Sequence, residues 1–233
     1  MNQVALVTGA GKRIGQAIAV YLAEIGYDVV VHYSSSQAGA EETKAKIENM
    51  GRTAYLIQSD LAETYAPKEL IGELAQRVGR LDLLVNSAST YPEPDRIQSQ
   101  HSFEKESEEE WEEAIAVNTR APFFLIKYAS KLLEKSENGL IINILDRSVD
   151  EMIPSRTAHT VSKNALKVVS DLGARSFAGK FRICSLLLGR IIPGERMSEE
   201  EVAAVRWVGI EPVLEEVGRI TAAGENGATY FIR

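Results

Sequence analysis

Short apolar runs alternate with amphipathic segments along the whole chain. Seven runs rich in β-branched and aliphatic residues are predicted to be strands: Val4–Val7, Asp28–His32, Thr53–Gln58, Leu81–Asn86, Leu140–Leu145, Arg182–Leu188 and Thr229–Ile232. Six segments between them are predicted to be helices: 13–25, 37–50, 64–79, 109–135, 157–178 and 211–223. The runs show little polar alternation, which is typical of strands covered on both faces. This order predicts an α/β fold with a doubly wound, parallel seven-stranded sheet and helices on both faces.

The composition is that of an ordinary globular protein. With 233 residues, and neither a proline- or serine-rich linker nor a repeat, the economical interpretation is a single domain over residues 1–233. A net charge of −7 argues against a nucleic-acid partner, which needs a basic face. One cysteine, no basic N-terminal region and no apolar run near 18 residues predict a cytoplasmic protein without a membrane partner.

A glycine-rich turn follows the first predicted strand and leads directly into a helix. It reads Thr8-Gly9-Ala10-Gly11-Lys12-Arg13-Ile14-Gly15. Glycines at this corner let backbone N–H groups approach a pyrophosphate at the N-terminus of the helix. The turn therefore predicts a Rossmann-type dinucleotide site, although any strand–helix corner can use glycine for purely structural reasons.

The end of the second strand bears on the choice of coenzyme. His32, Tyr33 and Ser34 stand there, and no carboxylate occurs before Glu41 to accept hydrogen bonds from the 2′-hydroxyl of NAD. Lys12 and Arg13 could instead meet a 2′-phosphate, which favours NADP(H) as the cofactor. The alternative is that these are only solvated turn residues.

Several motifs together resemble the short-chain dehydrogenase/reductase family. They are the Thr8–Gly15 turn, Ser59-Asp60-Leu61, Asn86-Ser87-Ala88-Ser89, Val117-Asn118-Thr119 and the Lys163 region, and they extend over nearly the whole chain. The turn, the second strand and the resemblance together predict a set of cofactor contacts: Gly9, Lys12, Arg13, Ile14, Gly15, His32, Tyr33, Ser34, Asp60, Leu61, Asn86, Ser87, Ala88, Lys163 and Gly189. The resemblance also implies a homodimer or homotetramer formed by the helices at 109–135 and 157–178.

Within that family, the chain is most similar to pteridine reductases. Arg13 replaces a glycine of the commoner turn. Asp146, thirteen residues before position 159, stands where most of the family carry serine. The resemblance implies a small, flat pterin-like substrate that stacks on Tyr91 and is bordered by the segment with Ile191 and Pro193. Tyr91 could equally be a residue that only packs its loop.

The catalytic helix departs from the family pattern. Where the family has Tyr-x-x-x-Lys, the chain reads His159-Thr160-Val161-Ser162-Lys163. The resemblance implies that Lys163 binds the nicotinamide ribose and that Asn118 helps hold the proton relay. Histidine can donate a proton as imidazolium, and Lys163 and Asp146 would have opposite effects on its pKa.

Three interpretations of this change stay open. The chain could be an active reductase that uses His159, Asp146, Lys163 and Asn118, a silent NADP(H)-binding relative, or a reductase with another donor such as Tyr91.

Helical spacing also lets Ala165, Val168, Val169, Leu172 and Phe177 share one broad apolar face. No metal-ligand spacing joins the three histidines, so no metal is expected.

Overall fold

The computed structural model describes residues 2–90, 103–194 and 197–233. Its strands form one parallel sheet in the order β3-β2-β1-β4-β5-β6-β7. The strands are β1 (Gln3–Val7), β2 (Tyr27–Tyr33), β3 (Ala54–Gln58), β4 (Leu83–Asn86), β5 (Leu140–Asp146), β6 (Arg182–Leu188) and β7 (Thr229–Ile232). All seven predicted strands are confirmed, with small shifts at their ends.

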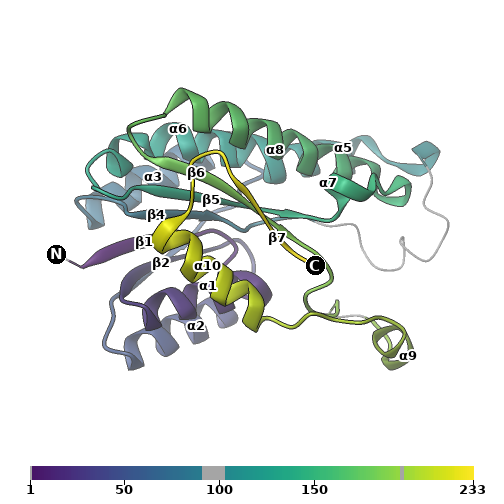
Figure 1. Ribbon diagram of the computed structural model, residues 1–233, viewed down its shortest axis with the longest axis horizontal. Helices are drawn as coiled ribbons and strands as arrows, with labels where there is room; N and C mark the ends of the chain where they lie inside the picture. Colours follow the sequence, from purple (N-terminus) through teal and green to yellow (C-terminus); the bar gives the residue numbers. More distant parts are fainter. Residues whose placement is uncertain (1, 91–102, 195–196) are drawn as a thin grey trace.

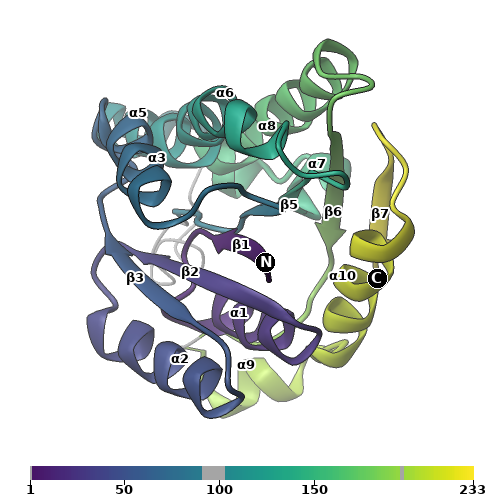
Figure 2. The ribbon, with the colours of Figure 1, turned by 90° about the vertical axis from the view of Figure 1, so that its left-hand side faces the viewer.

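Two layers of helices cover the sheet (Figures 1 and 2). One face carries α1 (Arg13–Glu24), α2 (Gln37–Asn49) and α10 (Glu211–Ala223). The other carries α3 (Ala66–Arg77), α5 (Glu108–Ile115), α6 (Ala121–Leu133) and α8 (Thr157–Ser176). Each layer encloses its own cluster of buried aliphatic side chains, which confirms that the strands are covered on both sides.

The helix predicted over 109–135 is interrupted. A turn of π-helix over Ala116–Arg120 separates α5 from α6. Pro122 has no N–H to donate to the carbonyl of Asn118 four residues earlier, so a regular α-helical bond is missing there. Such π-turns are frequent at functional sites, and this one carries Asn118.

Three short elements near the carboxyl ends of the strands were not predicted. They are α7 (Ser148–Glu151), a 3₁₀ turn over Pro154–Arg156, and α9 (Glu199–Ala203). Helix α9 begins with a capping box in which Ser198 and Glu201 bond each other's backbone N–H. That Ser-x-x-Glu spacing was a usable signal for a helix start.

The apolar face expected on α8 is split in two. Val169 and Phe177 are partly buried and pack against the cluster between this layer and the sheet, whereas Val168 and Leu172 are 55% and 57% exposed. The five residues predicted to share a face have helical spacing, but the sheet covers only part of the surface on which they lie, so the expectation of one broad face is corrected.

The described parts of the chain contain no helix with the length and apolarity needed to cross a membrane.

Candidate active site

The glycine-rich turn between β1 and α1 is packed too tightly for side chains at its glycines. Gly9 has φ +66°, and a Cβ there would lie 2.9 Å from the Cα of Ala88. A Cβ on Gly15 would lie 2.3 Å from the carbonyl oxygen of Gly9. Arg13 also has positive φ, +52°, a backbone conformation that glycine adopts more easily. The turn therefore brings backbone close to whatever lies at the N-terminus of α1.

The loop after β4 is tied to this turn. The Thr8 hydroxyl oxygen accepts hydrogen bonds from the backbone N–H groups of Ser87 and Ala88, both at 3.0 Å. Asn86 donates to the side-chain oxygen of Asn143 on β5 at 2.7 Å. These bonds fix the carboxyl ends of β1, β4 and β5 relative to one another, which is where doubly wound sheets bind ligands.

His32 supports the turn from the inside. Its Nδ1 accepts a hydrogen bond from the Gly9 N–H at 3.2 Å, so Nε2 carries the hydrogen and donates to the Ser59 carbonyl oxygen at 3.1 Å. The ring is 1% exposed, and burial lowers its pKa to about 4. Both ring nitrogens are therefore used within the protein, and the expected cofactor contact of His32 stays a prediction.

The His32 pKa predicts an acid-sensitive fold. Because the folded-state pKa lies below the ordinary value of about 6.5, neutral His32 contributes roughly 3 kcal/mol of stability above pH 6.5, which is lost as pH falls toward 4. Urea unfolding across that range should show this decrease. In His32→Asn, whose amide oxygen can still accept from Gly9 N–H, the decrease should be smaller by about that amount. An equal acid dependence in both proteins would contradict this assignment.

The remaining predicted cofactor residues surround the turn. Tyr33 and Leu61 are buried, Ser34 and Asp60 are exposed, and Asp60 accepts from the Ala62 N–H at 2.9 Å. A Cβ on Gly11 would lie 2.2 Å from the Ser36 hydroxyl, so the end of β2 borders the turn directly. Lys12, Ile14 and Gly189 lie at the same carboxyl edge of the sheet by their positions after β1 and β6.

Arg13 connects the turn to the segment after β6. Its Nη1 donates to the carbonyl oxygen of Pro193 at 2.9 Å. Ile191, two residues earlier, is buried and packs with the cluster between the sheet and α10. Its side chain therefore anchors this segment in the core, and Pro193 lies beside Arg13. The expected substrate contacts of Ile191 and Pro193 stay predictions.

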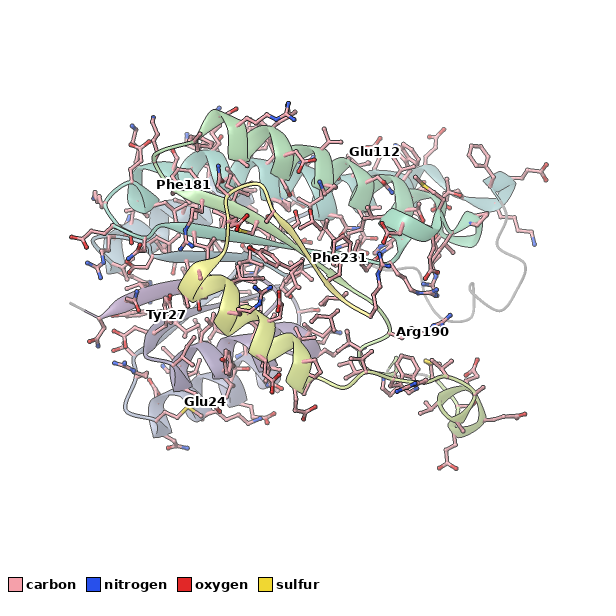
Figure 3. All side chains as sticks on the ribbon, viewed as in Figure 1. Glu24, Tyr27, Glu112, Phe181, Arg190 and Phe231 are labelled. Atoms are coloured by element: carbon pink, nitrogen blue, oxygen red, sulfur yellow. The ribbon has the colours of Figure 1, made fainter. Side chains whose placement is uncertain are left out.

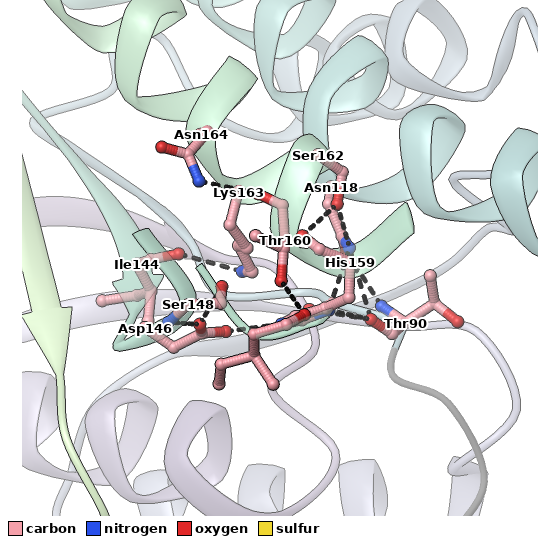
Figure 4. A network of polar contacts seen from close by, with 12 residues as sticks. Thr90, Asn118, Ile144, Asp146, Ser148, His159, Thr160, Ser162, Lys163 and Asn164 are labelled. Atoms are coloured by element: carbon pink, nitrogen blue, oxygen red, sulfur yellow. Dashed lines mark hydrogen bonds and ion pairs between the residues drawn. The ribbon is translucent and has the colours of Figure 1, made fainter. Parts of the chain in front are cut away.

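Figure 3 shows the described side chains on the ribbon. A second group of polar side chains lies at the carboxyl end of β5 (Figure 4). Nε2 of His159 on α8 is 2.6 Å from Oδ2 of Asp146, and Nδ1 is 3.0 Å from the carbonyl oxygen of Thr90. The carbonyl can only accept, so Nδ1 carries a hydrogen. One further proton is then shared between Nε2 and the Asp146 carboxyl, as imidazolium and carboxylate or as imidazole and carboxylic acid.

The two partners differ in access to solvent. The His159 side chain is 2% exposed and that of Asp146 is 30% exposed. Burial raises the pKa of Asp146, but the hydrogen bond and charge of His159, with Lys163 and Ser148, outweigh burial and hold that pKa well below its ordinary value. Asp146 is the member of the pair that faces outward.

Asn118 and Lys163 complete this group. Oδ1 of Asn118 accepts from the Thr90 N–H at 3.0 Å, and its Nδ2 donates to the Ser162 hydroxyl at 3.0 Å. Asn118 thus holds the Thr90 carbonyl against His159. Lys163 is buried and donates to the Ile144 carbonyl at 3.1 Å, and burial lowers its pKa, partly offset by the charge of Asp146.

A family model described as short chain dehydrogenase matches residues 3–192. The chain belongs to this family. A Thermotoga maritima relative called an uncharacterized oxidoreductase is 33% identical over 205 residues, which make up 88% of this chain and 76% of the relative. A 3-oxoacyl-(acyl-carrier-protein) reductase FabG from Staphylococcus epidermidis is 29% identical, with coverages of 85% and 77%.

A solved structure shows the same fold as this short chain dehydrogenase. The angucycline C-6 ketoreductase LanV, crystallised with bound NADP, superimposes with a TM-score of 0.87 over 98% of this chain and 93% of its own. Its sequence identity is 24%.

The structure brings together most of the side chains predicted for catalysis. Asp146, Asn118, His159 and Lys163 form one network, whereas Tyr91 lies outside the described residues. The Thr90 carbonyl was missed, because no sequence pattern marks a backbone oxygen. No three His, Cys, Asp or Glu side chains within residues 2–90, 103–194 and 197–233 gather where they could hold a metal ion.

Proposed function

We propose that this short chain dehydrogenase is an NADPH-dependent oxidoreductase that transfers a hydride to a C=N or C=O bond of a small molecule. The observation that carries the proposal is the short Asp146–His159 contact, with Lys163 beside it, at the carboxyl edge of the sheet. The Asp146–His159 pair offers a transferable proton at this edge of the sheet, which the glycine-rich turn also borders. Reduction of a carbonyl or imine requires a proton in addition to the hydride.

The residues around the turn fit the coenzyme. The close approaches at Gly9 and Gly15 leave backbone, not side chains, at the N-terminus of α1, where a pyrophosphate would bind. No carboxylate ends β2, and Ser34 is exposed there with Lys12 in the neighbouring turn. This arrangement suits a 2′-phosphate and favours NADPH over NADH. NADPH supplies the hydride when it is bound.

Lys163 is suited to hold the nicotinamide ribose. Its ammonium group has three N–H donors, and one of them bonds the Ile144 carbonyl. Burial of this group disfavours its charge, so acceptors such as the ribose hydroxyls would stabilise it. The family resemblance assigns the same role to this residue.

We infer that the proton reaches the substrate through Asp146. Both ring nitrogens of His159 are engaged, Nδ1 by Thr90 and Nε2 by Asp146, so the imidazole has no other N–H to offer. The outward-facing Asp146 carboxyl can take the proton from Nε2 and pass it to the substrate. His159 would then take up another proton for the next turnover. Asn118 keeps the imidazole ring of His159 in place through its bond to Thr90.

The resemblance to pteridine reductases supports a pterin-like substrate, and the 3-oxoacyl-(acyl-carrier-protein) reductase FabG among the relatives supports a carbonyl compound. The Arg13–Pro193 bond holds the segment after β6 beside the glycine-rich turn, where Pro193 would border the substrate. Tyr91 remains a proposed stacking residue.

An assay of the purified protein with NADPH and a panel of pterins, quinones and ketones tests this function. We expect NADPH oxidation that depends on one of these acceptors. If NADPH binds but no acceptor causes its oxidation, the protein is the silent relative, and the proposed activity is wrong.

We also propose that the exposed apolar face of α8 forms a homodimer interface, as the family resemblance implies. Val161, Val168 and Leu172 stand on this face at spacings of whole helical turns. Leu172→Glu should convert the assembly to monomers in size-exclusion chromatography with light scattering, because the charge would be buried without a partner. Exposed Glu199→Gln on α9 is the control. A monomeric wild-type protein would contradict the proposal.

A further inference from the structure

Three buried polar side chains form a chain of hydrogen bonds from the sheet into α8. Asn86 of β4 lies opposite Asn143 of β5, and its Nδ2 donates to Oδ1 of Asn143 at 2.7 Å. Nδ2 of Asn143 donates to the hydroxyl oxygen of Ser170 at 2.8 Å. The Ser170 hydroxyl in turn donates to the carbonyl oxygen of Leu166, also at 2.8 Å. Asn86, Asn143 and Ser170 are each at most 3% exposed, so Asn143 joins two strands to α8 inside the core.

This polar chain gives no clear gain in stability. Between 140 and 145, every other residue of β5 is leucine or isoleucine. Burial of an amide costs free energy that its hydrogen bonds largely offset, and replacement of both partners by apolar groups can be nearly neutral or stabilising. The cost is visible at Asn86, whose buried Oδ1 has no hydrogen-bond partner in the described parts of the chain. A hydrogen bond is directional, however, and so fixes a helix against a strand more narrowly than aliphatic contacts do.

One buried stripe of α8 lies against the sheet. Its members are separated by four, three and four residues, and each is at most 4% exposed: His159, Lys163, Leu166 and Ser170. Side chains at these spacings stand on one face of a helix. A helix moves as a rigid rod, so a shift of Ser170 along β5 would displace His159 and Lys163 with it.

The stripe is bonded to β5 at three places. Nε2 of His159 is 2.6 Å from Oδ2 of Asp146 (Figure 4). Nζ of Lys163 donates to the Ile144 carbonyl oxygen at 3.1 Å. The third bond is the one from Asn143, about two helical turns further along α8. The first two use groups that the proposed reaction also uses, whereas the third touches neither the coenzyme nor the transferred proton.

We propose that Asn143 and Ser170 are positioning residues for the reduction. Their hydrogen bond fixes α8 along β5 and thereby sets the distance between His159 and Asp146. This inference rests on the proposed function and assigns two residues remote from the glycine-rich turn to the geometry of the same site. Misplacement of a reacting group by about 1 Å can cost about 100-fold in rate, so a smaller displacement of α8 should cost about tenfold.

The Ser170→Ala variant tests this inference, because it removes the acceptor for Asn143 and nothing else. Ser176→Ala is the matched control, since the exposed Ser176 hydroxyl also donates to the carbonyl four residues earlier on α8, that of Leu172, at 2.8 Å. Ser170→Ala should lower the single-turnover rate of hydride transfer about tenfold, and Ser176→Ala should keep the wild-type rate.

A second variant separates positioning from a loss of folding. Asn143→Leu removes the donor, while Ser170 keeps its bond to Leu166. This change should cause the same loss of rate, and the double variant Asn143→Leu/Ser170→Ala should lose no more than either single variant, because both act through one bond. Losses that multiply in the double variant would contradict the shared role. Circular dichroism identifies the variants that are folded.

Proton NMR gives a readout that needs no turnover. The short hydrogen bond between His159 and Asp146 should give a strongly deshielded proton resonance, and Asp146→Asn identifies that resonance by its loss. The resonance should move upfield in folded Ser170→Ala, because the contact lengthens, and stay in place in Ser176→Ala. An unchanged resonance, or an unchanged rate, in Ser170→Ala would overturn the inference. If the wild-type protein binds NADPH but reduces no acceptor, the proposed function fails, and the resonance alone tests whether Ser170 positions His159.

Discussion

The Asp146→Asn variant should lose about 10²–10⁴-fold in kcat, the usual contribution of a positioned general acid. Asparagine has the same shape, and it can still accept from Ser148 N–H and donate to a neutral His159, so the network should survive. It cannot carry the shared proton to the substrate. NADPH affinity should change little, and single-turnover kinetics should place the whole loss in the chemical step.

The control for this variant is Asp150→Asn, four residues along the chain, where the carboxylate pairs with Arg233 at the surface. It should keep nearly the wild-type rate. A fully active Asp146→Asn protein would show that the proton comes from elsewhere.

Gly15→Ala should weaken NADPH binding by about 100-fold or more. Its Cβ would lie 2.3 Å from the Gly9 carbonyl oxygen, so the backbone that faces the pyrophosphate must move. Each tenfold loss corresponds to about 1.4 kcal/mol, and a displaced set of backbone donors readily costs twice that. Isothermal titration calorimetry with NADPH measures the change directly.

Gly72→Ala in α3 is the matched control, because a Cβ there meets nothing within 4 Å. It should leave NADPH affinity unchanged and stabilise the fold by about 0.5–1 kcal/mol, since alanine is the better helix former. Equal NADPH affinity in Gly15→Ala and wild type would mean that the glycine-rich turn is only a structural corner.

The sheet was predictable because its signal is local. Strands covered on both faces read as apolar runs, and each of the seven was found at its expected place. The split face of α8 was not predictable in the same way. Spacing shows that Val168 and Leu172 can lie on one apolar arc, but the width of the arc that the sheet covers depends on how the helix is rotated against it.

The site was predictable by residue type, and less so by role. Asp146, His159, Lys163 and Asn118 are marked in the sequence, but the occupation of both ring nitrogens of His159 depends on a carbonyl oxygen of Thr90. His32 was assigned to the cofactor because it ends β2. Only three-dimensional packing shows that its ring is enclosed between Gly9 and Ser59.

A fluorescence titration of the purified protein with NADPH, repeated with NADH, is the most direct test of whether the glycine-rich turn forms a coenzyme site. We expect saturable binding of NADPH, at least about tenfold tighter than that of NADH, since the 2′-phosphate adds charge-assisted contacts. Saturable binding with NADH preferred, or no binding of either reduced coenzyme, would contradict it.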